Sequence, residues 1–114
     1  AIANMEYTLA GKPYTGYPAF SAPEAYASYL AGLGIDVFLT ANNHIFDKGA
    51  AGAERTLTRY RKLQDEKKIR FTGLAGSVEE LAETTPLTVG KIRIGIAPFF
   101  IILLLTSSKQ QIIL

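Results

Sequence analysis

The amino-acid sequence predicts a layered α/β fold in which parallel strands alternate with helices. Residues 35–39 form an almost continuous apolar run, which is typical of a parallel strand covered on both faces. An amphipathic pattern follows over residues 50–66, with apolar side chains at helical spacing, and it predicts a helix. Residues 69–72 then read as a second, short strand. Strand, helix and strand in succession indicate an α/β sheet.

The composition limits the classes of function that are expected. The chain has 114 residues, of which 48% are hydrophobic, and this is enough for one modest core. Its formal net charge is only +2, and basic and acidic side chains are interleaved along residues 54–68, so nucleic acid is not an expected partner. The absence of cysteine excludes disulfides, thiolate metal sites and cysteine nucleophiles. Any metal would therefore need oxygen and imidazole ligands.

The first twenty residues predict a short strand and a structured loop. Residues 2–7 alternate apolar and polar side chains, as at a strand end, which places Asn4 and Glu6 on one face. Residues 8–20 contain two glycines and two prolines with aromatic residues between them, so an ordered loop is expected there. The aromatic residues should pin this loop to the body of the domain.

A helix is expected to begin near residue 23. Ser21 and Glu24 have the spacing of a capping box, and Pro23 suits the first helical turn. Gly34 is the expected stop. The apolar positions between them follow helical spacing and should form the buried stripe: Tyr26, Tyr29, Leu30 and Leu33.

Two further short elements are expected in the C-terminal third. Ser77 and Glu80 have capping-box spacing and predict one or two helical turns. Residues 87–89 and 92–94 alternate around a Gly-Lys turn, and this pattern predicts a β-hairpin.

The end of the chain is strongly apolar. The run 94–105 is shorter than the roughly 20 residues that a membrane-spanning helix needs, so it is interpreted as a buried strand that continues past Pro98. Residues 1–98 are therefore expected to form one domain, and residues 99–114 an apolar tail without an assigned structure.

The candidate functional site is the polar turn that follows the 35–39 strand. Ligands of open α/β sheets bind beyond the carboxyl ends of the strands, where this turn should lie. Asn42 and Asn43 offer carboxamides, His44 is the only histidine of the chain, and Asp47 can orient its imidazole. The N-terminus of the next helix would favour an anion there. The same residue types also fit an ordinary hydrogen-bonded turn, and the pattern alone leaves both interpretations open.

Several motifs of the chain occur together in one known family. The most specific is the run Ala41-Asn42-Asn43-His44 followed by Asp47-Lys48-Gly49. The other matching stretches are Asn4-Met5-Glu6, the loop ending in Phe20, the helix from Pro23, Gly34-Ile35-Asp36-Val37, Thr56 with Leu57, and Phe71-Thr72-Gly73. Together they resemble the CapA-type capsule and poly-γ-glutamate synthesis proteins, which are related to calcineurin-like metallophosphoesterases. The resemblance runs from about residue 4 to residue 97. It implies a fragment of the four-layer αββα calcineurin-like metallophosphatase fold.

The resemblance also implies roles for individual residues. Asn43 would be a metal ligand, and His44 would be the catalytic imidazole that assists the leaving group. Glu6 falls where relatives place an acidic metal ligand. The implied cofactor is a divalent metal (Mn, Zn, Fe or Mg) in the full-length protein, and the implied substrate is an anionic polymer or a phosphate-like molecule. The residues expected to support this site are Asn4, Asn42 and Asp47.

The implied function is bacterial capsule or poly-γ-glutamate biosynthesis at the cell envelope, on the extracellular side of the membrane, with a membrane synthesis complex as partner. Two activities fit this resemblance: a metal-dependent hydrolase, or a non-catalytic accessory subunit of a polymer synthesis and export complex. A polysaccharide- or peptide-binding module built on the aromatic loop is a third. The family's opening Gly-Asp strand and its later histidines are missing, and the chain begins without methionine. We therefore expect a piece of a longer protein that, on its own, neither binds a metal tightly nor hydrolyses substrate.

Overall fold

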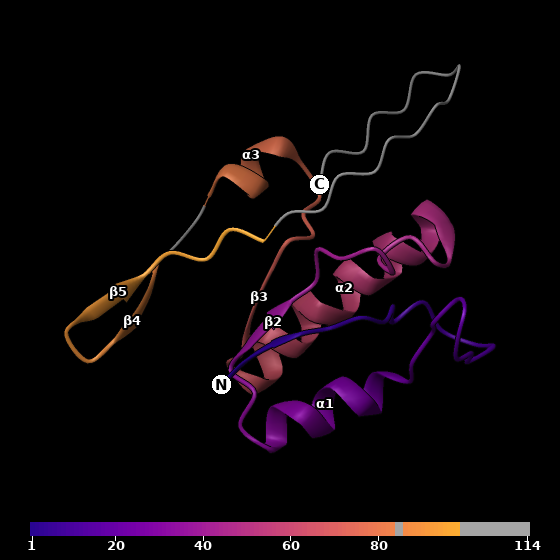
Figure 1. The fold of residues 1–114 in the computed structure, drawn as a ribbon, viewed down its shortest axis with the longest axis horizontal. Coiled ribbons are helices and arrows are strands. Elements are labelled where there is room, and N and C mark those ends of the chain that lie inside the picture. Colours follow the sequence, from indigo (N-terminus) through magenta and orange to yellow (C-terminus); the bar gives the residue numbers. More distant parts are fainter. Residues whose placement is uncertain (84–85, 99–114) are drawn as a thin grey trace.

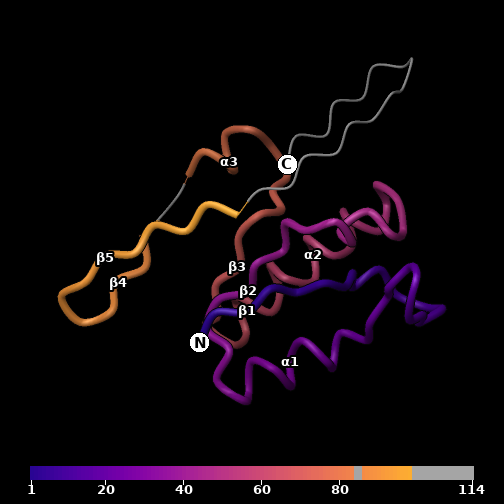
Figure 2. Tube along the Cα trace, in the orientation of Figure 1, coloured from indigo at the N-terminus to yellow at the C-terminus, as the bar shows by residue number. Residues whose placement is uncertain are grey.

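The computed structural model describes residues 1–83 and 86–98, and its centre is a three-stranded parallel sheet (Figure 1). In the sheet register, Ala3, Phe38 and Phe71 lie side by side. Figure 2 shows the strands adjacent to one another in the same order as in the sequence. The predicted α/β sheet with parallel strands is therefore confirmed. The strands are β1 (Ile2–Asn4), β2 (Val37–Leu39) and β3 (Arg70–Thr72).

Two helices, α1 (Glu24–Gly32) and α2 (Gly49–Lys67), connect the strands and pack on one face of the sheet. Each helix joins a strand to its parallel neighbour, and right-handed crossovers in this order put both helices on the same side. The core there joins Ala27 of α1 and Tyr60 of α2 to Phe38 of β2, and all three are fully buried. This layer holds the strands in place and thereby fixes where their carboxyl ends lie.

Helix α2 has the buried face that its sequence predicts. Thr56 extends this face: its hydroxyl donates to the Gly52 carbonyl at 2.8 Å and accepts the Leu9 N–H at 2.9 Å. Because Leu9 belongs to the loop after β1, this contact ties that loop to the helix. The apolar side chains that recur at helical spacing along residues 50–66 are buried on this face: Ala53, Leu57, Tyr60 and Leu63.

The start of α1 differs from the prediction. The prediction of a capping box at Ser21 is wrong, because Pro23 is the N-cap residue and no side chain caps the helix. The Ser21 hydroxyl instead donates to the Gly11 carbonyl at 2.7 Å, and the Ser21 backbone exchanges two hydrogen bonds with Thr15. Ser21 is therefore committed to the preceding loop, and the helix begins beyond it.

The buried stripe predicted for α1 is also wrong. Tyr29 and Leu33 are 63% and 64% exposed, whereas Ala27 is completely buried and Leu30 is partly buried against the core. A small side chain at position 27 lets the helix approach the sheet closely, so the larger side chains move to the margin. There the Tyr26 ring packs against that of Tyr7, with centroids 5.3 Å apart.

Helix α3 (Val78–Ala82) begins with the predicted cap. The Ser77 hydroxyl accepts the Glu80 N–H at 3.1 Å, and a Glu80 carboxylate oxygen accepts the Gly76 N–H at 2.7 Å. The same carboxylate forms an ion pair with Arg61 of α2 at 2.6 Å. Hydrogen bonds from the Arg61 guanidinium, and next from the Gly76 N–H, lower the pKa of Glu80.

The predicted β-hairpin is present as β4 (Leu87–Val89) and β5 (Ile92–Ile94), an antiparallel pair that projects away from the parallel sheet in Figure 1. The sequence predicted a buried strand over residues 94–105, but residues 95–98 form no strand. The part of this prediction beyond residue 98, and the predicted tail at 99–114, lie outside the described residues. Among the described helices, none is long and apolar enough to cross a membrane.

Candidate functional site

The carboxyl ends of β1 and β2 meet at one edge of the sheet, and predicted site residues lie there. Asn4 is the last residue of β1, and its amide donates to a Glu6 carboxylate oxygen at 3.0 Å. Asn42 follows β2, and its amide donates to the Asn4 side-chain oxygen at 3.3 Å. The parallel register places Asn4 opposite Leu39, which explains why segments far apart in the sequence meet here. Asn4, Glu6 and Asn42 thus form one hydrogen-bonded row.

Asn42 links this strand end to the turn that carries His44. Its side chain is buried, and its Nδ2 also donates to the Met5 carbonyl at 2.8 Å. Its Oδ1 accepts the His44 backbone N–H at 3.0 Å, which closes the turn locally, as asparagine side chains often do. With both ends of its carboxamide engaged by the protein, Asn42 sets the conformation of the turn and is not exposed to a ligand.

His44 and Asp47 form a close pair within the turn. The distance from His44 Nδ1 to Asp47 Oδ2 is 2.9 Å, and the two side chains are only 16% and 12% exposed. In the part of the chain that the structure describes, the other ring nitrogen, Nε2, forms no hydrogen bond. Helix α2 begins directly after the turn at Gly49, as the sequence predicts. The arrangement orients the imidazole through one nitrogen and leaves the second available for chemistry.

Phe20 completes the surroundings of His44, and it was not among the predicted site residues. Its backbone N–H donates to Asp47 Oδ2 at 2.7 Å. Its ring packs edge-on against the His44 imidazole, with centroids 4.7 Å apart and planes at 74°. The sequence predicted that aromatic residues would pin this loop to the domain, but nothing in the local pattern distinguished Phe20 from Tyr14 or Tyr17.

The two predicted metal ligands, Asn43 and Glu6, are both exposed at this end of the sheet. The Asn43 carboxamide forms no hydrogen bond within the described residues, so its oxygen is available. Oxygen donors of these types suit Mg, Mn, Fe or Zn. Within residues 1–83 and 86–98, however, no three His, Asp or Glu side chains gather closely enough to hold a metal ion. The described residues therefore supply only part of the ligand set that a tightly held metal needs.

Gly73 supports the site from the loop after β3. Its φ of +109° lies in the region that favours glycine, and a Cβ added there would lie 2.6 Å from the backbone nitrogen of Ala41. Ala41 immediately precedes Asn42. The close approach at this glycine is therefore to the backbone of the candidate site.

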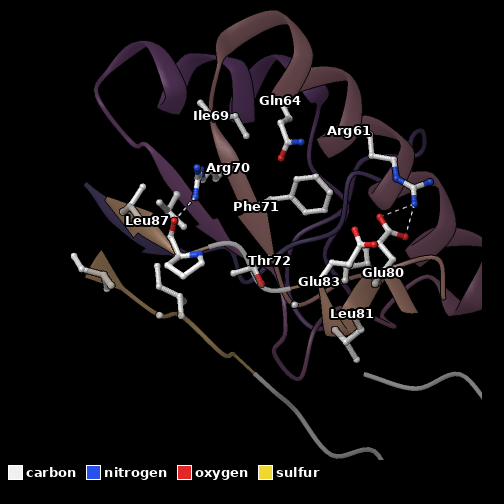
Figure 3. A pocket seen from close by; sticks show the side chains of 18 of the residues that line it. Arg61, Gln64, Ile69, Arg70, Phe71, Thr72, Glu80, Leu81, Glu83 and Leu87 are labelled. Atoms are coloured by element: carbon white, nitrogen blue, oxygen red, sulfur yellow. Dashed lines mark hydrogen bonds and ion pairs between the residues drawn. The ribbon is translucent and has the colours of Figure 1, made fainter. Parts of the chain in front are cut away.

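A separate cavity of about 640 Å³ lies beside β3, and none of the predicted site residues lines it (Figure 3). Its walls include Phe71 of β3, Gln64 of α2 and Leu81 of α3. The Arg61 guanidinium in its wall is bonded to Glu80 and is thereby neutralised. Because the imidazole, its carboxylate partner and the free carboxamide all lie elsewhere, we place the candidate site at the turn and not in this cavity.

Comparison with known proteins identifies the family. The sequence profile of the bacterial capsule synthesis protein PGA_cap matches residues 1–111. No curated protein and no solved structure matches the chain. The parallel sheet with its helices is the α/β arrangement expected for a fragment of the calcineurin-like fold associated with this family. The chain therefore belongs to the bacterial capsule synthesis protein family, which gives it a role in capsule biosynthesis at the cell envelope.

Proposed function

We propose that this chain carries part of a metallophosphatase-like hydrolytic site that acts on an anionic capsule polymer, such as poly-γ-glutamate, or on a phosphate-like molecule. The observation that supports this function best is the His44–Asp47 pair at the carboxyl end of β2, with Nε2 of the imidazole unengaged among the described residues. An oriented histidine beside the end of a parallel strand is what acid–base chemistry on a bound ligand requires.

In this proposal His44 moves a proton at Nε2. Asp47 Oδ2 accepts a hydrogen bond from Nδ1–H, orients the ring and stabilises the imidazolium that forms when Nε2 takes up a proton. The imidazolium can then deliver that proton to the departing oxygen or nitrogen of the substrate. Proton transfer by a positioned side chain is usually worth about 10²–10⁴-fold in rate.

The proposed cofactor is a divalent metal ion, which would supply Lewis-acid activation of the substrate and of water when bound. Asn43 and Glu6 would hold it in the full-length protein, together with carboxylate or imidazole ligands from beyond the described residues. Asn4 would orient Glu6 through the hydrogen bond between their side chains. No part of the role of His44 described above depends on this ion.

A second candidate function, an accessory subunit of a polymer synthesis and export complex in the membrane, has its own supporting observation. Tyr29 of α1 and Leu33, the C-cap residue of this helix, are four residues apart, and both are more than 60% exposed. The N-terminal amino group bonds the carbonyl of Gly34, so exposed Ile2 lies near the same end of α1. Exposed apolar side chains that lie close together are typical of a surface that contacts another protein.

Turnover assays on the full-length protein separate the two functions. With Mn or Zn present, and with poly-γ-glutamate and model phosphoesters as substrates, His44→Ala should lower turnover about 10²–10⁴-fold. The matched control is Tyr29→Ser, which lies outside the site and should retain the parent rate. Equal rates in the parent and the His44→Ala variant would remove His44 from the mechanism. A parent without turnover whose co-purification with membrane components is lost on Tyr29→Ser would favour the accessory subunit.

A further inference from the structure

Phe20 contacts the His44–Asp47 pair in two different ways, and neither the family match nor the sequence motifs assign it a role. We infer that Phe20 is a positioning residue, which holds the neutral His44 imidazole as the Nδ1–H tautomer with the lone pair of Nε2 facing outward. The inference deepens the proposed function and rests on it, because it makes His44 a proton acceptor at Nε2 before it becomes a donor.

One oxygen of Asp47 contacts both Phe20 and His44. Asp47 Oδ2 accepts the backbone N–H of Phe20 at 2.7 Å and lies 2.9 Å from His44 Nδ1. A backbone N–H can only donate, so this oxygen acts as the acceptor in both contacts. The proton between Asp47 and His44 must then belong to Nδ1. A neutral imidazole carries one proton, which leaves Nε2 without one.

The ring of Phe20 stands edge-on to the His44 imidazole at a centroid separation of 4.7 Å, an arrangement that is favourable for aromatic pairs. The ring packs on the imidazole, and the Asp47 side chain beside it is only 12% exposed, so little water reaches the carboxylate. We expect the ring contact also to oppose rotation of the imidazole, which would exchange Nδ1 for a carbon atom in front of the carboxylate.

Phe20 is itself held in place by Thr8. Its carbonyl accepts the hydroxyl of Thr8 at 2.7 Å, and Thr8 is completely buried. The Thr8 carbonyl in turn accepts the N–H of Ala22 at 2.8 Å, so the chain on both sides of Ser21, including the Phe20 carbonyl, is fixed to the segment that leaves β1. The N–H that reaches Asp47 is therefore held in direction by contacts at the end of the sheet, and not by the loop alone.

The experiment uses the fact that the whole 114-residue chain contains one histidine. A sample labelled with ¹⁵N in histidine gives a single imidazole in long-range ¹H–¹⁵N spectra, recorded above the pH range in which ordinary histidines titrate. The parent should show a protonated-type shift at Nδ1 and an unprotonated-type shift at Nε2. The ring protons of His44 should also carry a displacement from the Phe20 ring current. Unprotonated Nδ1 in the parent would overturn the inference.

The variants separate positioning from general structure. Phe20→Ala should move both nitrogen shifts toward a tautomer average, whereas Phe20→Leu, which keeps an apolar cover, should keep the parent tautomer and lose only the ring-current displacement. Asp47→Ala, which removes the acceptor oxygen, should also move both shifts toward a tautomer average. Tyr14→Ala is the matched control, because Tyr14 is in the same loop, is 47% exposed and forms no ring pair with Phe20, and its spectrum should equal that of the parent. A parent-like tautomer in Phe20→Ala would refute the role.

One further variant covers the case in which Phe20→Ala does not fold. Thr8→Val has nearly the same shape but cannot donate to the Phe20 carbonyl, so it should also move the shifts toward an average, and a parent-like tautomer there would refute the anchoring. None of these readouts depends on turnover. A fixed Nδ1–H tautomer in a protein without hydrolysis would count against the proposed function alone, and an averaged tautomer in an active protein would count against the inference alone.

Discussion

Asn42 and Asn43 are neighbours of identical chemistry in opposite environments, and their replacement by alanine should have very different effects on stability. The Asn42 side chain is 7% exposed and forms three hydrogen bonds, to Met5 O, Asn4 Oδ1 and the His44 N–H. Asn43 is exposed and forms none within the described residues. The pair therefore measures what the contacts at the strand ends contribute, with the residue type held constant.

The expected loss for Asn42→Ala follows from these contacts. Each hydrogen bond contributes about 0.5–1.5 kcal/mol net, and a buried carbonyl left without a partner costs about 1–3 kcal/mol. Met5 is buried, so its carbonyl loses its partner, whereas Asn4 is exposed and can bond to water instead. We expect a loss of about 2–4 kcal/mol for Asn42→Ala, and a change within about 0.5 kcal/mol for Asn43→Ala.

Urea unfolding followed by circular dichroism measures both values. At an m-value of about 2 kcal/mol per molar urea, Asn42→Ala should lower the midpoint by roughly 1–2 M while the slope stays constant. Asn43→Ala should leave the midpoint within experimental error of the parent. Equal midpoints in the two variants would refute this expectation. They would mean that the buried contacts of Asn42 add no more stability than the exposed Asn43 does.

Three further predictions concern the core, the site loop and metal binding. The buried Tyr60 hydroxyl has no hydrogen-bond partner among the described residues, and burial raises its pKa, so above about pH 10 the unfolded state ionises first and stability falls as pH rises. Tyr60→Phe should therefore raise the free energy of unfolding by about 1 kcal/mol at neutral pH and by more at alkaline pH, as measured by urea unfolding. Gly73→Ala should clash with the backbone of Ala41 and lower stability by about 2–4 kcal/mol, whereas Gly16→Ala, in open space, should unfold like the parent. Calorimetric titration of the isolated chain with Mn or Zn should give a Kd above about 1 μM, and tighter binding would show that the ligand set was underestimated.

The fold was predictable where the local pattern and the tertiary environment agree. Helix α2 is long and strongly amphipathic, and its apolar stripe is the face that packs on the sheet. Helix α1 is short and apolar on several sides, so its pattern offers more than one possible buried face. The structure buries the face with Ala27 and leaves Tyr29 and Leu33 exposed. Which face is buried depends on the packing of the whole layer and cannot be read from nine residues.

The sequence predicts which residue types make up the candidate site, but it does not predict all of the contacts among them. The residue types around His44, and their place after a parallel strand, are local features of the sequence. The parallel register then brings Asn4 and Glu6 to the same edge, which follows from the fold class alone. The role of Phe20 could not be found in this way, because its contact with Asp47 spans 27 residues and depends on the path of an irregular loop.

The hydrogen bonds that Asn42 forms with β1 and Met5 also affect when the site forms during folding. Its hydrogen bonds to Met5 and Asn4 close loops of 37 and 38 residues, whereas the backbone bonds within α2 are local. Contacts with a large separation in sequence carry the greater loop-closure entropy and on average form later. We therefore expect the turn around His44 to adopt its final geometry only after β1 has added to β2. An imidazole in its native environment would then report that β1 has paired with β2, and the NMR signal of the single histidine can follow this step of folding.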